Sequence, residues 1–170
     1  IRFQRAKLHI ILELAKHFID KRGVDPQYFE KELKNRNWNI WNMDPKDTEY
    51  YQGNLPLRKV NDAVGHAVRA VYLYTGMAEV AAQTNDKELK EACGRVWNSI
   101  TKRRMFINGG IGSMGQGELF SVDYDLPNDT TYCETCASIG LVFFASRMLE
   151  MEVDRKYSDI MEKAFYNTVL

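Results

Sequence analysis

The sequence has 170 residues, an apolar fraction of 45% and a formal net charge of zero. Its length fits one domain or part of one, and the apolar fraction is sufficient for a packed core. A neutral chain without a basic stripe argues against nucleic acid as the main partner, and the longest apolar runs fall far short of the roughly 20 residues of a membrane span. Three cysteines are too few for a disulfide framework, which favours a cytosolic or metal-linked use of the thiols.

The first third of the chain carries one long helical pattern, followed by a more irregular stretch. Residues 3–22 repeat apolar side chains at helical spacing and end at Gly23, which predicts a helix with a glycine at its C-terminal cap. Asp25 and Pro26 open a shorter helical pattern. From there to Lys59 the sequence is aromatic-rich and irregular.

The next four helical segments alternate in how they distribute apolar residues. Residues 61–84 and 135–151 are apolar on almost every face, whereas residues 86–102 and 154–170 carry a single apolar stripe. A helix that is apolar all round is buried on all sides, and a striped helix lies on the outside. The alternation predicts an all-α toroid, in which an outer ring of helices surrounds an inner ring. Since four or five helices cannot close such a ring, the chain is expected to be a segment of a larger barrel.

About thirty residues interrupt the helical pattern before the segment at 135–151. Structureless connections of this length are uncommon unless they are functional or disordered. This connection contains five glycines together with four aromatic residues, Phe106, Phe120, Tyr124 and Tyr132. Such a density of aromatic side chains predicts a folded loop that lines a site.

Cys133 and Cys136 form a CxxC pair where this loop meets the next helix. One such pair is half of a structural zinc site, and the chain has no second pair. Glu134 and Cys136 lie two positions apart across the helix start, where the backbone can bring both side chains to one ion. The alternative is a buried cysteine pair beneath the helix, a common role of free cysteine. The residues alone leave both interpretations open.

Three further side chains suggest chemistry in the same region. Glu118 and Glu134 flank the loop as candidate carboxylates for glycoside hydrolysis, which generally uses an acid/base and a nucleophile on opposite sides of the scissile bond. His66 lies near the start of a buried helix, and this helix end is expected at the same end of the ring as the loop. The alternative for His66 is a hydrogen-bonded core residue beside Arg69.

Three blocks of the sequence carry a family resemblance: LPLRKVNDAVGHAVRAVYLYTG, NGGIGSMGQGELFSVDYDLPNDTTYCETCASIGLVFFASRML and EKAFYNTVL. Together they resemble glycoside hydrolase family 127, the β-L-arabinofuranosidases, over about Tyr51 to Leu170. The resemblance implies an (α/α)6-barrel catalytic domain. We therefore expect residues 1–170 to be part of one such domain, truncated at both ends.

The resemblance also implies a mechanism and residue roles. Family members resemble retaining glycosidases whose nucleophile is a zinc-bound cysteine, and the adjacent cysteine pair that supplies it is absent from this sequence. Glu134 and Cys136 match two zinc ligands, and Glu118 matches the general acid/base. His66 and Glu162 match positions that contact the sugar. By this resemblance the cofactor is zinc, and the chain alone is expected to be inactive.

The expected substrate is a β-L-arabinofuranoside or a related plant-derived oligosaccharide or glycoconjugate. An open barrel exposes its inner helices, which predicts association into a homo-oligomer. A reducing cytoplasm suits an exposed zinc thiolate, so a cytoplasmic location is expected. Two other functions stay open: a carbohydrate-binding or scaffold barrel without catalytic activity, and a structural zinc protein.

Overall fold

Helices make up almost all of the regular structure in the computed structural model, which describes residues 2–36 and 44–170. Within these ranges the extended backbone pairs only at isolated bridges. The helices and single turns are α1 Arg2–Lys21, α2 Tyr28–Arg36, η1 Leu57–Lys59, α3 Ala67–Thr84, α4 Lys87–Arg103, η2 Gln116–Glu118, α5 Thr135–Met151, α6 Arg155–Ala164 and the π-helical turn η3 Phe165–Val169. The all-α class expected from the sequence is confirmed.

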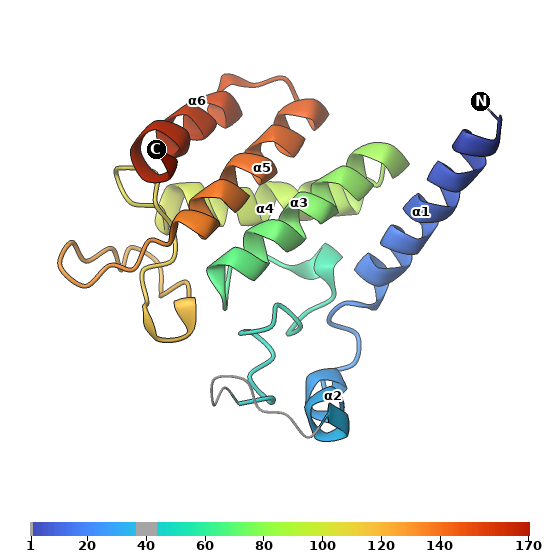
Figure 1. The fold of residues 1–170 in the computed structure, drawn as a ribbon, viewed down its shortest axis with the longest axis horizontal. Helices are drawn as coiled ribbons and strands as arrows, with labels where there is room; N and C mark the ends of the chain where they lie inside the picture. The colour runs from blue at the N-terminus through green and yellow to red at the C-terminus, as the bar shows by residue number, and fades with distance from the viewer. Residues whose placement is uncertain (1, 37–43) are drawn as a thin grey trace.

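The four helices α3 to α6 form two layers. α3 and α5 run side by side in the same direction, α4 packs on α3, and α6 packs on α5 (Figure 1). The N-terminal ends of α3 and α5 therefore lie at the same end of the pair, next to the glycine-rich loop that precedes α5. This arrangement matches the predicted alternation of inner and outer helices.

An aromatic cluster at the centre joins all four of these helices. Phe144 of α5 lies 5.8 Å from Tyr74 of α3 and 5.7 Å from Trp97 of α4, measured between ring centroids. Trp97 in turn contacts Tyr157 of α6 at 4.9 Å, edge to face. Such pairs add about 0.5–1.5 kcal/mol each beyond the burial of their area. The cluster fixes the two layers relative to each other.

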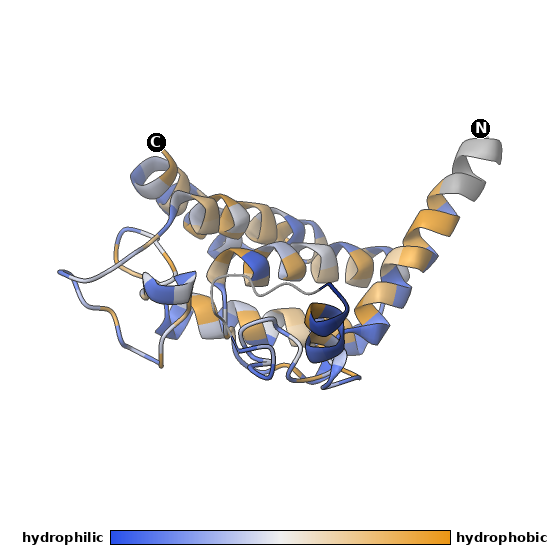
Figure 2. Cartoon of the chain, turned by 60° about the horizontal axis from the view of Figure 1, so that its bottom comes forward, coloured by the Kyte–Doolittle hydropathy of each residue, from blue (hydrophilic) through white to orange (hydrophobic). Residues whose placement is uncertain are grey.

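The inner helices are exposed on the face that no other element covers in the described residues. Tyr72 of α3 is 47% exposed and Phe143 of α5 is 48% exposed, with their rings 6.1 Å apart. The prediction that both helices are buried on all sides therefore holds only for the faces toward α4 and α6. Hydrophobic residues colour much of α1 (Figure 2). Exposed apolar side chains of this helix are Leu8, Ile10, Ile11, Leu14 and Phe18.

One predicted helix boundary is wrong, and one predicted helix changes type near its end. The segment 61–84 becomes helical only at Ala67, because Gly65 has a positive φ of 71° and the preceding backbone is bonded elsewhere. The N–H of Ala63 donates to Ser99 Oγ, and that of His66 donates to the Tyr50 carbonyl. In the last segment the α-helix ends at Ala164 and continues as the π-helical turn η3.

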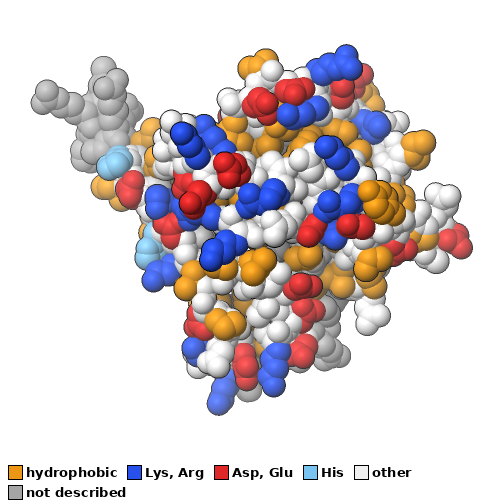
Figure 3. Space-filling view, turned by 180° about the vertical axis from the view of Figure 1, so that it is seen from behind, with side chains coloured by type: hydrophobic (Ala, Val, Ile, Leu, Met, Phe, Trp, Pro, Cys, Tyr) orange, Lys and Arg blue, Asp and Glu red, His pale blue; other side chains and the backbone are white. Residues whose placement is uncertain are grey.

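The face seen from behind carries acidic and basic side chains interspersed over α4 (Figure 3). Among the residues coloured in that view, neither sign forms a broad patch. This distribution agrees with the zero net charge of the sequence. In the described part of the chain, none of the helices is long and apolar enough to cross a membrane.

Candidate functional site

Three extended segments meet at the N-terminal end of α3. The N–H of His66 donates to the Tyr50 carbonyl at 3.2 Å, and the N–H of Phe120 donates to the Gly65 carbonyl at 2.9 Å. His66 and Leu119 also form an antiparallel bridge. These contacts hold His66 at the N-cap position of α3 and bring the glycine-rich loop beside it.

Glu118 lies in a tight turn of that loop. Met114 and Leu119 exchange both of their backbone hydrogen bonds, at 3.2 and 3.1 Å, which closes a short hairpin. Inside it Gly117 and Glu118 both adopt positive φ angles, of 75° and 54°. A left-handed conformation is unfavourable for a residue with a Cβ, and such strain concentrates at functional sites.

The Glu118 carboxylate has a separate partner on each oxygen. His66 Nε2 lies 2.9 Å from Oε2, and the Tyr132 hydroxyl donates to Oε1 at 3.1 Å. The Glu118 side chain is still 35% exposed, so a ligand has access to it. The carboxylate is thus oriented by two donors and also accessible.

The surroundings of His66 favour its neutral form. Burial lowers its pKa below 6.5, and the positive charge of Arg69 lowers the pKa further, which outweighs the opposite effect of Glu118 and Glu134. A neutral ring that carries its proton on Nε2 can donate that proton to Glu118 Oε2, 2.9 Å away. Its Nδ1 atom is then a buried acceptor that has no hydrogen-bond partner among the described residues.

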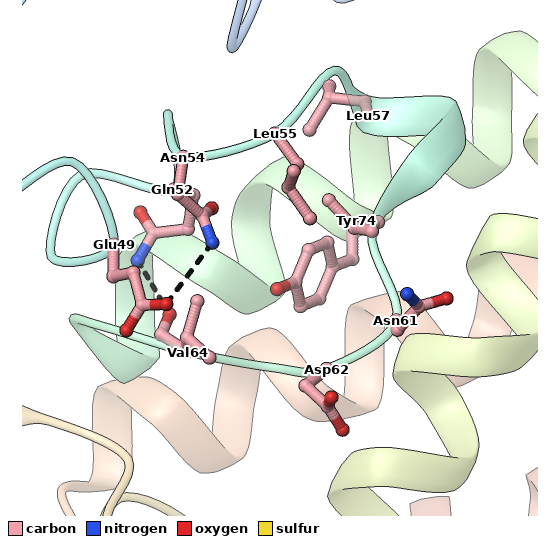
Figure 4. A pocket seen from close by; sticks show the side chains of 10 residues that line it. Glu49, Gln52, Asn54, Leu55, Leu57, Asn61, Asp62, Val64 and Tyr74 are labelled. Atoms are coloured by element: carbon pink, nitrogen blue, oxygen red, sulfur yellow. Dashed lines mark hydrogen bonds between the residues drawn. The ribbon is translucent and has the colours of Figure 1, made fainter. Parts of the chain in front are cut away.

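Gln52 fixes the backbone on which His66 lies. Its buried amide nitrogen approaches the carbonyl oxygens of Tyr50, Val64 and His66, at 3.0, 3.0 and 3.2 Å. Gln52 also lines a cavity of about 160 Å³, together with Glu49, Asn54 and other residues (Figure 4). None of the site residues predicted from the sequence lines this cavity.

Glu134 and Cys136 meet at the N-terminal end of α5. Glu134 occupies the N-cap position, and Cys136 lies in the first turn. A hydrogen bond from the thiol to the Glu134 carboxylate and the negative charge of that carboxylate raise the pKa of Cys136. The Oε2 atom of Glu134 is buried and has no hydrogen-bond partner within the described residues.

The donor set of Glu134 and Cys136 fits one side of a zinc site. Carboxylate oxygen and cysteine sulfur are both common zinc ligands, and structural and catalytic zinc ions take three or four protein ligands. Across residues 2–36 and 44–170, no group of three His, Cys, Asp or Glu side chains is arranged to hold a metal ion. Within the described residues, Glu134 and Cys136 are two neighbouring candidate ligands, and the Glu134 oxygen without a hydrogen-bond partner is suited to such a role.

Cys133, the other cysteine of the CxxC pair, packs against the loop. Its Sγ atom lies 2.9 Å from Thr131 Oγ1, and a Cβ atom at Gly110 would lie 2.9 Å from the same sulfur. The residue adopts a positive φ of 42°. The side chain is half-buried beneath the glycine-rich loop.

Glu162 is apart from the other predicted residues. Among the described contacts, no hydrogen bond or ion pair joins its side chain to His66, Glu118 or Glu134. It is exposed near the C-terminal end of α6 and lines a shallow groove with residues that include Phe165 and Tyr166. Its predicted sugar contact stays a prediction.

The structure adds two residues that the sequence did not single out for a role. Tyr132 was visible only as one of several loop aromatics, and its contact with Glu118 depends on how the loop folds back. Gln52 gave no signal at all, because an isolated glutamine in an irregular stretch has no pattern. Its positive φ of 52° and the following Gly53 are the local features that mark a turn.

Comparison with known proteins gives a consistent result. Residues 10–170 match the catalytic-domain model of β-L-arabinofuranosidases of glycoside hydrolase family 127. A non-reducing end β-L-arabinofuranosidase of Bifidobacterium longum subsp. longum is 44% identical over 158 residues, which make up 92% of this chain and 24% of that protein.

Solved structures resemble the fold over the same extent. A family 127 β-L-arabinofuranosidase from Geobacillus stearothermophilus T6 has a TM-score of 0.86 and 51% identity, over 93% of this chain and 25% of that one. A second family 127 β-arabinofuranosidase has a TM-score of 0.77 and 39% identity, over 93% of this chain and 22% of the other. The chain spans about a quarter of the length of these relatives. Its helices correspond to a segment of an (α/α)6 barrel, and the chain belongs to the catalytic domain of glycoside hydrolase family 127.

Proposed function

We propose that this chain is part of a retaining glycoside hydrolase that cleaves β-L-arabinofuranosides or related plant-derived glycans. The observation that carries the proposal is the Glu118 carboxylate, oriented by His66 and Tyr132 yet accessible. It lies in the loop that leads into the N-terminal end of α5, which bears Glu134 and Cys136. Family membership supplies the reaction class, and the named activities of the relatives suggest the sugar.

In this proposal Glu118 is the general acid/base. It protonates the leaving oxygen when the glycosidic bond breaks, and then removes a proton from the water that releases the sugar. A single carboxyl group performs both steps because it is uncharged in the first and charged in the second. A positioned acid/base of this kind contributes about 10²–10⁴-fold to the rate.

Glu134 and Cys136 would hold zinc together with ligands from outside this sequence. Zinc, when bound, keeps a cysteine nucleophile deprotonated at neutral pH. The part that this chain plays is to present a buried carboxylate oxygen and a thiol from one helix end. His66 and Glu162 are proposed to contact the sugar, and His66 has a free Nδ1 acceptor among the described residues. We also propose that the protein forms a homo-oligomer and that it works in the reducing cytoplasm.

The stereochemistry of the first product tests this function. The full-length protein is incubated with a β-L-arabinofuranoside, and the anomer released first is identified by proton NMR. Retention requires that β-L-arabinofuranose appears before mutarotation, with the α-L-arabinofuranoside as a control substrate that stays intact. Release of the α anomer first, or no hydrolysis by the zinc-loaded protein, would contradict the proposal.

A further inference from the structure

We propose that Tyr132 is a positioning residue that holds the Glu118 carboxylate in its reactive orientation. The inference rests on the proposed function, because it concerns the group assigned there as the acid/base. Tyr132 is not itself required to touch the sugar. It acts through Glu118.

The contact geometry explains why a second donor is needed. The torsion that turns a glutamate carboxylate about its last carbon–carbon bond is broad, so one hydrogen bond leaves its plane poorly defined. Here Tyr132 donates to Oε1 at 3.1 Å while His66 Nε2 lies 2.9 Å from Oε2. Two donors on different oxygens restrict the plane of the carboxylate as well as its position.

Tyr132 is itself held by the loop that carries Glu118. Its N–H donates to the Ser113 carbonyl at 3.2 Å, and the next N–H, of Cys133, donates to the Gly112 carbonyl at 2.9 Å. The ring lies over Gly115, where an added Cβ atom would approach it to 3.5 Å. Tyr132 thus runs alongside the hairpin of residues 114–119, and its hydroxyl reaches the end of that hairpin.

This placement couples two parts of the site. Tyr132 lies on the short segment that leads directly into Glu134 and α5. A retaining glycosidase needs its acid/base and its nucleophile held at a fixed separation on opposite sides of the scissile bond. One tyrosine that joins the Glu118 hairpin to the segment bearing a predicted zinc ligand helps to keep that separation constant.

The test compares Tyr132→Phe with Tyr124→Phe in the full-length protein. Tyr124 lies in the same loop, is 71% exposed, and its hydroxyl makes no hydrogen bond within the described residues. Each variant is assayed on two β-L-arabinofuranosides, one with an alkyl leaving group and one with a 2,4-dinitrophenyl leaving group. The alkyl substrate needs protonation by Glu118, whereas the dinitrophenolate leaves without it.

Tyr132→Phe is expected to lower kcat/KM on the alkyl substrate by about 10–100-fold, as a small displacement of a catalytic group does, and to spare the dinitrophenyl substrate. Tyr124→Phe leaves both values unchanged, and Glu118→Gln shows the same selective loss as Tyr132→Phe in a stronger form. Equal losses on both substrates, or none, would overturn the inference. A wild-type protein inactive on both substrates would instead refute the proposed function. A crystal structure of Tyr132→Phe with Glu118 still in one ordered conformation would refute the positioning role independently of activity.

Discussion

His66 Nε2 lies 2.9 Å from Glu118 Oε2, although the two residues come from different segments of the chain. One is at the N-cap of α3 and the other is in a strained turn of the glycine-rich loop. The contact exists because residues 50–52, 64–66 and 119–120 are hydrogen-bonded to one another around His66. The start of α3 and the glycine-rich loop therefore form one hydrogen-bonded unit. Substitutions of the residues that hold this unit together are expected to displace Glu118.

Substitution of Gln52, whose amide approaches the backbone around His66, tests whether these segments depend on one another. Gln52→Leu removes the amide that approaches three backbone carbonyls, and Val64 loses a partner for its carbonyl oxygen. The free energy of unfolding is expected to fall by about 1–3 kcal/mol, because a buried polar group left unsatisfied is costly. Urea unfolding measures this change. As a control, Gln83→Leu on the exposed surface of α3 changes stability by less than about 0.5 kcal/mol, and equal effects of the two variants would refute the role of Gln52.

The contact between α3 and α5 depends on a glycine. An alanine Cβ at Gly140 would lie 2.4 Å from Val71 Cγ2, so Gly140→Ala forces the two inner helices apart. Overpacking of this kind costs about 1–3 kcal/mol. Gly76→Ala on α3 is the matched control, because its Cβ meets no atom within 4 Å. Gly76→Ala is expected to stabilise the protein by about 0.5–1 kcal/mol. Thermal unfolding measures both variants, and a shift in melting temperature of the same sign for both would contradict this packing.

Asp86 provides a prediction about pH. Its carboxylate accepts the Leu89 N–H as the N-cap of α4, and it forms an ion pair with Arg58 at 2.6 Å. Burial raises the pKa of Asp86, but the hydrogen bonds from Arg58 and Leu89 outweigh burial, and the net pKa lies below 3.8. Because the pKa is lower in the folded state than in the unfolded chain, the charged carboxylate stabilises the fold above pH 3.8. This contribution is lost as the pH falls through the lower, folded-state value.

Asp86→Ala is therefore expected to lower the free energy of unfolding by about 1–2 kcal/mol at pH 7, the usual value of an N-cap. The difference between wild type and variant shrinks as the pH is lowered below 3.8. Urea unfolding at several pH values measures it. Asp159→Ala, at a side chain that is 65% exposed, is the control with little effect at any pH, and a pH-independent difference for Asp86→Ala would contradict the linkage.

The two cysteines of the CxxC pair are expected to differ in metal binding. Cys136→Ala removes a proposed ligand beside the buried Glu134 oxygen, and it is expected to lower the zinc content of the full-length protein well below one ion per chain. Cys133→Ala is expected to keep the zinc, because its thiol contacts Thr131 and the loop. Elemental analysis of both purified variants measures this. Equal zinc contents would rule out the proposed ligand role of Cys136.

The layered arrangement of the helices could be predicted because the spacing of apolar residues in each segment indicates which of its faces are buried. For α5 the first and last residues are also the predicted ones. The start of α3 was not predicted correctly, because the backbone before it is hydrogen-bonded to residues far away in the sequence, Tyr50 and Ser99. Family resemblance pointed to His66 and Glu118, which the structure brings together. The contact of Tyr132 with Glu118 depends on the pairing of residues 132–133 with 112–113, which leaves no mark in local sequence.

The most direct test is the hydrolysis of an alkyl β-L-arabinofuranoside by the full-length protein and by its Glu118→Gln variant, with zinc content and thermal stability measured alongside. We predict turnover by the wild type and a loss of about 10²–10⁴-fold in kcat for the variant, because the alkyl alcohol leaves only when it is protonated; zinc and fold are retained. Equal turnover by the two proteins, or none by a zinc-loaded wild type, would contradict the assignment of Glu118 as the acid/base of a β-L-arabinofuranosidase.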